Sequence, residues 1–249
     1  MGISTRQQGG LFTVTLDNPT NNNALDASAL AEIGYALDHA EAEPALRVLA
    51  FTARGPVFCS GSDLGGTVSM APAEAAQLYF STLRRFAASS LIVVSVVDGA
   101  VQAGGVGLAA ASDYVLCSPH ASFRLPEVLI GLIPACVLPF LRRRVGVHNS
   151  QMLALTAQKI DAERALALHL ADQLTPDVND ALRRFVLSVE RIPEQVVASL
   201  KTYMGQLAPI TDAEQELAVG SIAALMEQPG SLDRVRELAE HGLWTGRQV

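Results

Sequence analysis

The hydrophobic and polar positions in the first half of the chain predict several strands. Residues 11–17, with the sequence LFTVTLD, alternate apolar and polar side chains, as a strand with one buried face does. Residues 47–53, 91–97 and 113–118 are mostly apolar and rich in β-branched side chains. Such runs are typical of strands that are buried on both faces.

Helical patterns lie between these strands. Asp26 is a suitable N-cap for a helix that ends before Pro44, and its apolar side chains share one face: Leu30, Ile33, Leu37 and Ala40. Pro72 begins a second helix, through about residue 87, with one apolar stripe: Ala76, Phe80, Leu83 and Ala87. Strands that alternate with helices predict an α/β core.

After about residue 150 the pattern becomes almost entirely helical. Prolines and the turn QPGS at 228–231 separate the expected helices, at residues 150–158, 161–170, 178–190, 194–207, 211–227 and 231–241. No fixed-period repeat or low-complexity linker precedes this part. We therefore expect it to continue the domain or to serve in oligomerisation.

Composition restricts the class of function. The 249 residues are 49% hydrophobic and 17% charged, which is enough apolar material for a sizeable core. A net charge of −7 argues against binding to the phosphate backbone of nucleic acids. The longest strongly apolar run, at 91–97, is too short to cross a membrane, and the N-terminus lacks the apolar core of a signal peptide. Cys59, Cys117 and Cys136 have neither disulfide-framework nor zinc-site spacing, so we expect the reducing cytoplasm.

Two glycine-containing turns follow predicted strands and carry candidate chemistry. In VQAGGVGLAAASD, residues 101–113, Gly104 and Gly105 begin a predicted helix whose first turn exposes unpaired N–H groups. Adjacent glycines also permit tight packing, and the turn lacks both the Gly-Lys-Ser/Thr of a phosphate loop and the spacing G-x-G-x-x-G. The second turn is PVFCSGSDL, residues 56–64. Each turn could offer one N–H to the same carbonyl oxygen, which predicts a two-donor oxyanion hole.

Glu127 lies in an apolar segment, FRLPEVLIGLIPACVLPFLRRRVG at 123–146. Burial beside Val128, Leu129 and Ile130 would disfavour the ionised carboxylate and raise its pKa toward the range useful for proton transfer. The dipole of a helix also favours a glutamate in the first turn. Position alone therefore leaves a catalytic and a structural role open.

Four segments, in this order and spacing, resemble the crotonase (enoyl-CoA hydratase/isomerase) superfamily. They are NNNALD at 21–26, FCSGSDL at 58–64, DGAVQAGGVGLAAASD at 98–113 and FRLPEVLIGLIP at 123–134. The resemblance covers nearly the whole chain and implies an α/β fold, a crotonase-like spiral of ββα units over residues 1–190. It also implies a C-terminal helical oligomerisation region at 191–249 and a homotrimer or a dimer of trimers.

The resemblance further implies a substrate and a site. The substrate is a small acyl thioester on the phosphopantetheine of CoA or of an acyl carrier protein, and we expect no separate cofactor and no metal. The N–H groups of Ser62 and Gly104 match the two oxyanion donors of the family. Glu127 matches one glutamate of the family hydratases, whereas Gly107 stands where those hydratases carry a second. A single acid/base carboxylate remains, which disfavours an ordinary two-glutamate hydratase.

Residues 101–146 are similar to the dehydratases of polyketide β-branching cassettes, which share the Ala-Gly-Gly opening without the first glutamate and the segment PACVLPFL. This similarity implies removal of water from 3-hydroxy-3-methylglutaryl on an acyl carrier protein, giving the 3-methylglutaconyl thioester, with Glu127 as acid/base. Three alternatives stay open. They are a generic enoyl-CoA hydratase or isomerase, a glutaconyl-carrier decarboxylase and a non-catalytic thioester-binding homologue.

Other polar residues are candidates for contacts with the substrate. We predict substrate binding by Asp63, Gly105 and Cys136, although Asp63 could equally cap the next helix and Cys136 is expected to be an apolar filler rather than a nucleophile. Arg124 and the run at 142–144 could meet an acidic carrier protein or a substrate carboxylate, or lie on the solvated surface. The histidines show no metal-site spacing and are expected to be structural.

Overall fold

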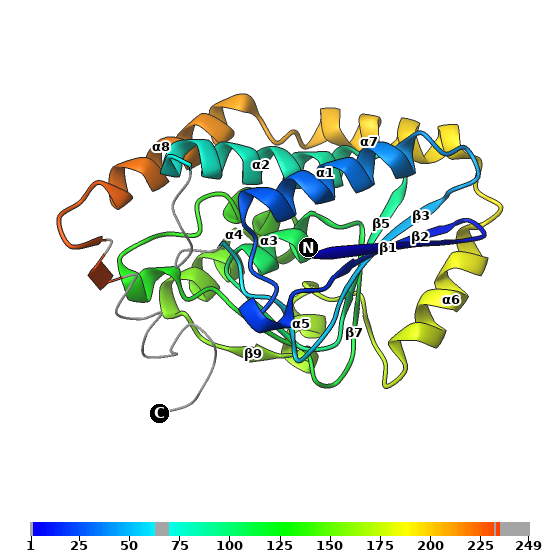
Figure 1. Ribbon diagram of the computed structural model, residues 1–249, viewed down its shortest axis with the longest axis horizontal. Helices are drawn as coiled ribbons and strands as arrows, with labels where there is room; N and C mark the ends of the chain where they lie inside the picture. Colours follow the sequence, from blue (N-terminus) through cyan, green and yellow to red (C-terminus); the bar gives the residue numbers. More distant parts are fainter. Residues whose placement is uncertain (1, 63–69, 232, 235–249) are drawn as a thin grey trace.

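The computed structural model describes residues 2–62, 70–231 and 233–234 (Figure 1). Within these residues the strands form two sheets. The larger sheet has the order β1 (Ile3–Gln8), β2 (Leu11–Leu16), β3 (Val48–Ala53), β5 (Ile92–Val97), β7 (Tyr114–Cys117) and β10 (Gln173–Leu174). The smaller sheet has the order β4 (Val57–Cys59), β6 (Ala100–Gln102), β8 (Ser122–Arg124) and β9 (Ile160–Asp161). The β1–β2 and β8–β9 pairs are antiparallel, and the other pairs are parallel.

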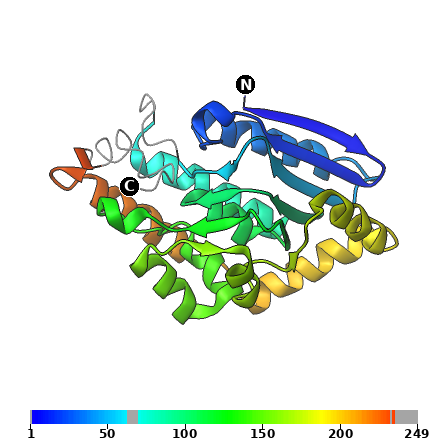
Figure 2. The ribbon, with the colours of Figure 1, turned by 90° about the horizontal axis from the view of Figure 1, so that it is seen from below.

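Successive parts of the chain repeat one unit, which consists of a strand of the larger sheet, a strand of the smaller sheet and a helix (Figure 2). The first unit is β3, β4 and α2 (Pro72–Ala88). The second is β5, β6 and α3 (Gly104–Ala111). In the third, β7 and β8 lead through the 3-10 helix η2 (Glu127–Ile130) to α4 (Leu138–Thr156). The predicted spiral of ββα units is confirmed.

The central strands of the larger sheet, β3, β5 and β7, are buried on both faces, as their sequences predict. On β3, Leu49 and Phe51 pack into the main core, together with side chains of α1 (Ala27–Glu41) and α2. The alternate residues Val48 and Ala50 pack against α6 (Val178–Val189) on the opposite face. This alternation follows from the two-residue period of a strand and places the central strands between two helical layers.

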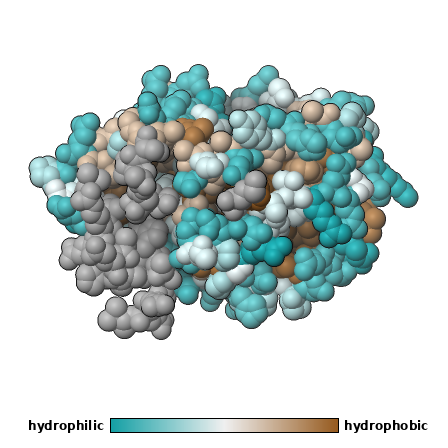
Figure 3. All heavy atoms as spheres, in the orientation of Figure 1, coloured by the Kyte–Doolittle hydropathy of each residue, from teal (hydrophilic) through white to brown (hydrophobic). Residues whose placement is uncertain are grey.

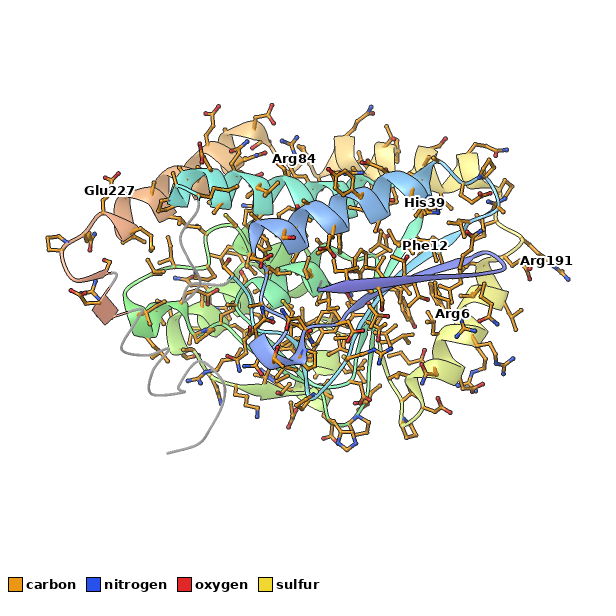
Figure 4. The ribbon with its side chains drawn as sticks, viewed as in Figure 1. Arg6, Phe12, His39, Arg84, Arg191 and Glu227 are labelled. Carbon is orange, nitrogen blue, oxygen red and sulfur yellow. The ribbon has the colours of Figure 1, made fainter. Side chains whose placement is uncertain are left out.

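One of these layers consists of α1 and α2, with α7 (Glu194–Leu207) and α8 (Asp212–Met226) lying beyond α2 (Figure 1). In the side view of Figure 3 the edge of this layer shows mostly hydrophilic residues with apolar ones between them, and α7 exposes Leu200, Tyr203 and Leu207. Arg84 of α2 donates to the carboxylate of Asp212 at 2.6 Å and to Gln215 Oε1 at 2.9 Å, which joins α2 to α8 (Figure 4). The remaining helices are η1 (Pro19–Asn21) and α5 (Ala162–Ala167). No helix in the described ranges is long and apolar enough to cross a membrane.

The structure also corrects several predicted elements. The helix expected at 150–158 begins at Leu138, as α4, and is kinked at Gly146, where φ is 80°. The strands β1, β4, β6, β8, β9 and β10 were not predicted. β4, β6 and β8 are only three residues long and β9 and β10 only two, and β4 and β6 also adjoin the glycine-containing turns. Most of the helix expected at 231–241 lies outside the described residues. The proposed boundary at residue 190 and the role of the region after it in oligomerisation stay predictions.

Lys201 attaches α7 to the core through a largely buried ammonium group. Its Nζ donates to the carboxylate of Asp113 at 2.7 Å and to the carbonyl oxygens of Leu91 at 3.0 Å and Phe86 at 3.3 Å. Its side chain is only 11% exposed, so these acceptors replace the water that the ammonium group loses on folding.

We predict that Lys201→Met lowers the free energy of unfolding, because the Asp113 carboxylate loses its partner. Breaking a buried ion pair typically costs about 3–5 kcal/mol, and partial exposure of Asp113 places this case at the lower end. Denaturant unfolding measures the change. The exposed Lys159 provides a matched control, Lys159→Met, which is expected to leave the stability nearly unchanged. Equal effects of the two substitutions would contradict the prediction.

Candidate active site

The smaller sheet brings the three predicted functional turns together. β4, β6 and β8 are neighbouring parallel strands, so their carboxyl ends meet at one edge. Ser62 follows β4, Gly104 follows β6 and Glu127 follows β8. In parallel α/β sheets this edge is where ligands bind. The arrangement depends on β4, β6 and β8, which the sequence pattern did not reveal.

The backbones of the first two turns are in direct contact. A Cβ built on Gly61 would lie 2.7 Å from the nitrogen of Gly104 and 2.6 Å from the Cβ of Ala103. A Cβ on Gly104 would lie 3.3 Å from the Cα of Gly61. Gly61 also has a φ of 89°, a conformation that glycine adopts without strain. Side chains at either glycine would force the two turns apart.

Two N–H groups at this contact have no acceptor among the described residues. The N–H of Gly104 belongs to the first turn of α3, where no intrahelical acceptor exists. Ser62 pairs with Leu25 in an isolated bridge, in which the Leu25 N–H donates to the Gly61 carbonyl at 2.7 Å. This bridge leaves the Ser62 N–H without an acceptor in the described ranges. Their role as oxyanion donors stays a prediction.

Glu127 has the buried environment that the sequence predicts. It begins η2, its backbone carbonyl accepts from the Leu132 N–H at 3.0 Å, and the residue is 8% exposed. Its Oε2 is buried without a hydrogen-bond partner among the described residues. Burial raises the pKa of Glu127 to about 7, against a smaller lowering by its own backbone N–H. A carboxyl with this pKa can exchange a proton near neutral pH.

Tyr79 of α2 also reaches this site, and the sequence analysis did not single it out. Its hydroxyl donates to the carbonyl oxygen of Gly104 at 2.5 Å. A Cβ built on Gly107 would lie 2.0 Å from that hydroxyl oxygen, so a side chain at position 107 would overlap Tyr79. The available signal was the spacing on α2, because Tyr79 lies three residues after Ala76 and four before Leu83, both on the predicted buried stripe.

The residues predicted to bind substrate lie in different surroundings. Gly105 packs against β4, since a Cβ there would lie 2.5 Å from the Cys59 carbonyl oxygen, and this contact alone requires a glycine. The thiol of Cys136 donates to the Ala76 carbonyl at 3.7 Å, and burial raises its pKa to about 12. Cys136 is thus a neutral thiol, as expected of a residue that is not a nucleophile. Asp63 lies outside the described residues. Substrate binding by these three residues stays a prediction.

The candidate arginines make contacts within the chain. Arg124 Nε donates to the Ala157 carbonyl at 2.8 Å. Arg142 forms an ion pair with Glu214 of α8. Arg144 forms one with Asp172, donates to the Ser112 carbonyl at 2.8 Å and has a side chain only 12% exposed. The interpretation of Arg144 as a solvated residue is therefore wrong, because Asp172 and the Ser112 carbonyl hold its guanidinium group against the core.

His39 of α1 is structural, since its ring packs at 5.2 Å from that of Phe12 (Figure 4). Within the described ranges, no group of three or more histidine, cysteine, aspartate or glutamate side chains is arranged to hold a metal ion. All three cysteines are buried and free.

Comparison with known proteins identifies the family of the chain. The family model described as enoyl-CoA hydratase/isomerase matches residues 6–238. The chain belongs to the enoyl-CoA hydratase/isomerase family. This membership confirms the crotonase resemblance and the predicted class of enzyme, a lyase of this superfamily.

Individual members of the enoyl-CoA hydratase/isomerase family resemble the chain over most of its length. The bacillaene synthase dehydratase PksH of Bacillus subtilis is 28% identical over 210 residues, which cover 82% of this chain and 81% of PksH. The crystal structure of pksH from Bacillus subtilis, described as a polyketide biosynthesis enoyl-CoA hydratase, has a TM-score of 0.90 at 25% identity and covers 97% of this chain and 98% of that chain. An enoyl-CoA hydratase from Mycobacterium avium has a TM-score of 0.87 at 28% identity, with 96% of each chain covered.

We predict that Glu127→Gln changes how stability depends on pH. The folded-state pKa of about 7 exceeds the ordinary value of 4.5, so the folded enzyme binds the proton more tightly than the unfolded chain does. Wild-type stability therefore falls as pH rises from about 4.5 to 7, by on the order of 3 kcal/mol, and is flat above that range. Glutamine cannot ionise, so the stability of Glu127→Gln does not fall over this pH range for this reason.

Denaturant unfolding of both proteins at pH 5 and pH 8 measures this effect. The stability of Glu127→Gln relative to wild type is expected to be greater at pH 8 than at pH 5. A difference between the two proteins that is the same at both pH values would show that Glu127 is not desolvated. Glu163→Gln, at an exposed position of α5, is the matched control and is expected to show no such pH dependence.

Proposed function

We propose that this enzyme removes water from 3-hydroxy-3-methylglutaryl carried on an acyl carrier protein and yields the 3-methylglutaconyl thioester, as in polyketide β-branching. The observation that carries the proposal is the buried carboxylate of Glu127, whose charge acts on the Tyr79 hydroxyl beside Gly104, together with two backbone N–H groups that have no acceptor among the described residues. The similarity to PksH, which is named as a dehydratase of bacillaene synthase, supports the choice of reaction.

The N–H groups of Ser62 and Gly104 would hold the thioester oxygen. Negative charge develops on this oxygen when the C2 proton leaves, and donors fixed in advance stabilise that charge without having to reorient. The α3 helix adds the positive end of its dipole at Gly104. Because the two turns are already in contact in the folded chain, the cost of arranging the donors is met during folding.

Glu127 would move the proton in two steps. Its carboxylate takes the proton from C2, and the electron pair of the C–H bond passes into the enolate. The enolate collapses to the C2–C3 double bond as the C3–O bond breaks, and the Glu127 carboxylic acid gives its proton to the departing hydroxyl group. Water leaves and the carboxylate is restored. A carboxyl with a pKa of about 7 is suited to accept and to return a proton.

The site favours this reaction over a two-glutamate hydration. Position 107 has no side chain, and the space next to it is filled by the Tyr79 hydroxyl. A second carboxylate that could hold a water molecule is therefore missing from α3. The phosphopantetheine arm arrives as part of the substrate. The homotrimer or dimer of trimers that we propose is supported by the exposed apolar side chains of α7, which include Leu200, Tyr203 and Leu207.

We predict that Glu127→Gln slows dehydration by about 100-fold or more, since proton transfer by a positioned side chain contributes 10²- to 10⁴-fold. The assay incubates the enzyme with 3-hydroxy-3-methylglutaryl-acyl carrier protein and follows the loss of one water by intact mass. The exposed Glu163→Gln serves as the matched control and is expected to retain wild-type activity.

Two results would contradict the proposed function. Near-wild-type turnover by Glu127→Gln would exclude Glu127 as the acid/base. Hydration of crotonyl-CoA by the wild-type enzyme, without dehydration of the carrier-bound substrate, would instead identify a generic hydratase.

A further inference from the structure

The hydroxyl of Tyr79 connects two helices at the centre of the site. Tyr79 lies on α2 and is 5% exposed, and its hydroxyl donates to the Gly104 carbonyl oxygen at 2.5 Å. The same ring runs along the glycine face of α3. A Cβ on Gly104 would lie 3.3 Å from the Tyr79 hydroxyl oxygen, and one on Gly107 would lie 2.0 Å from it. Tyr79 thus excludes a side chain at Gly107 and leaves little room for one at Gly104.

The peptide group next to Gly104 needs such a restraint. Glycine has the greatest backbone freedom of any residue, so its own conformation does not fix the direction of its N–H. Ala103, just before it, has φ 47° and ψ −122°, a strained conformation that persists only where neighbours hold it. The Ala103 N–H donates to the Arg124 carbonyl at 3.0 Å, which fixes the chain on that side. Tyr79 fixes it on the other side, at the carbonyl of Gly104.

Tyr79 is not arranged to act as an acid or base. A tyrosine hydroxyl can donate one hydrogen bond, and that of Tyr79 is donated to the carbonyl oxygen of Gly104. Burial raises the pKa of Tyr79 well above its ordinary value, as do the nearby groups of Cys136, Cys59 and Glu127, so the hydroxyl stays protonated. The hydroxyl can therefore donate to the Gly104 carbonyl throughout the neutral pH range.

We propose that Tyr79 is a positioning residue: by holding the carbonyl of Gly104 it restrains the backbone angles of this glycine, and so fixes the direction in which the N–H of the preceding peptide group points at the thioester oxygen. The proposal rests on the oxyanion role of Gly104 in the proposed function. It implies that Tyr79 acts on the rate of the chemical step and leaves binding of the acyl chain and carrier almost unchanged.

A double-mutant cycle tests this proposal. Tyr79→Phe removes the hydroxyl and keeps the ring, while Gly107→Ala introduces a Cβ that pushes the hydroxyl away from Gly104. Both changes break the same hydrogen bond. Each is expected to lower kcat by about tenfold with KM changed less than twofold, because a small misplacement of an oxyanion donor weakens only the transition state. The double variant is expected to be about tenfold slower than wild type, not a hundredfold.

Matched controls exist for both substitutions. Tyr114→Phe changes a tyrosine that stacks on Phe185, on the other side of the larger sheet. Gly205→Ala changes a helical glycine of α7 with no atom within 4 Å of its built Cβ. Both controls are expected to keep wild-type kcat. Additive losses in the double variant, an unchanged kcat in Tyr79→Phe, or a loss expressed in KM alone would overturn the proposal.

An infrared measurement separates this proposal from the proposed function. The carbonyl band of 3-methylglutaconyl-pantetheine is recorded free and bound, and donors at the oxygen shift it to lower frequency. Wild type is expected to produce the shift, and Tyr79→Phe and Gly107→Ala to reduce it. The enzyme could fail to dehydrate the carrier-bound substrate and yet show a band shift that is reduced in Tyr79→Phe. That result would support the positioning role of Tyr79 and reject the proposed reaction. A full shift in Tyr79→Phe, or no shift in wild type, would reject the positioning role.

Discussion

The site depends on the close approach of two backbone turns at Gly61 and Gly104. Ordinary side chains would prevent it, since a Cβ on Gly61 would lie 2.7 Å from the Gly104 nitrogen. The approach brings together the two turns whose N–H groups at Ser62 and Gly104 have no acceptor in the described part of the chain, and it leaves no room for a side chain at Gly61. It is stabilised by elements on either side, through the Leu25 N–H on Gly61 and the Tyr79 hydroxyl on Gly104. The proposed chemistry therefore depends on the lack of a side chain at Gly61 and Gly104.

Glu127 imposes the opposite kind of constraint, because it introduces a polar group into an apolar region. Its Oε2 has no partner among the described residues, which makes the charged form of the carboxyl costly. The surrounding core compensates through well-packed layers on both faces of the larger sheet. Natural enzymes commonly retain such locally unfavourable groups at the place where a reaction requires them.

Much of the fold could be predicted from local patterns. The strand at 47–53 and the helix that follows Asp26 have clear periodicity, and Asp26 caps α1 by accepting from the Ala29 N–H at 2.7 Å. Glu127 could be recognised from its apolar neighbours. In contrast, β4 and β6 are too short to show the two-residue hydrophobic period of a strand, and the glycines that follow them are typical of turns.

The parts that could not be predicted depend on contacts between distant segments. The hydrogen bond of Tyr79 joins residues that are 25 positions apart, and the ion pair of Arg144 reaches 28 positions along the chain to Asp172. No local pattern contains such distances. The sequence pointed to Gly107 as a missing carboxylate, and only the packing of α2 on α3 shows what fills its place.

The repeated ββα unit has a consequence for how this family can diversify. Ser62, Gly104 and Glu127 are each supplied by the turn that leaves a different strand of the smaller sheet. Each turn belongs to a separate unit with its own helix, so one group can be exchanged while the scaffold and the other two stay as they are. A lineage could thus acquire a new reaction by changes in one or two units, and the pairing of Gly107 on α3 with Tyr79 on α2 would involve two adjacent units.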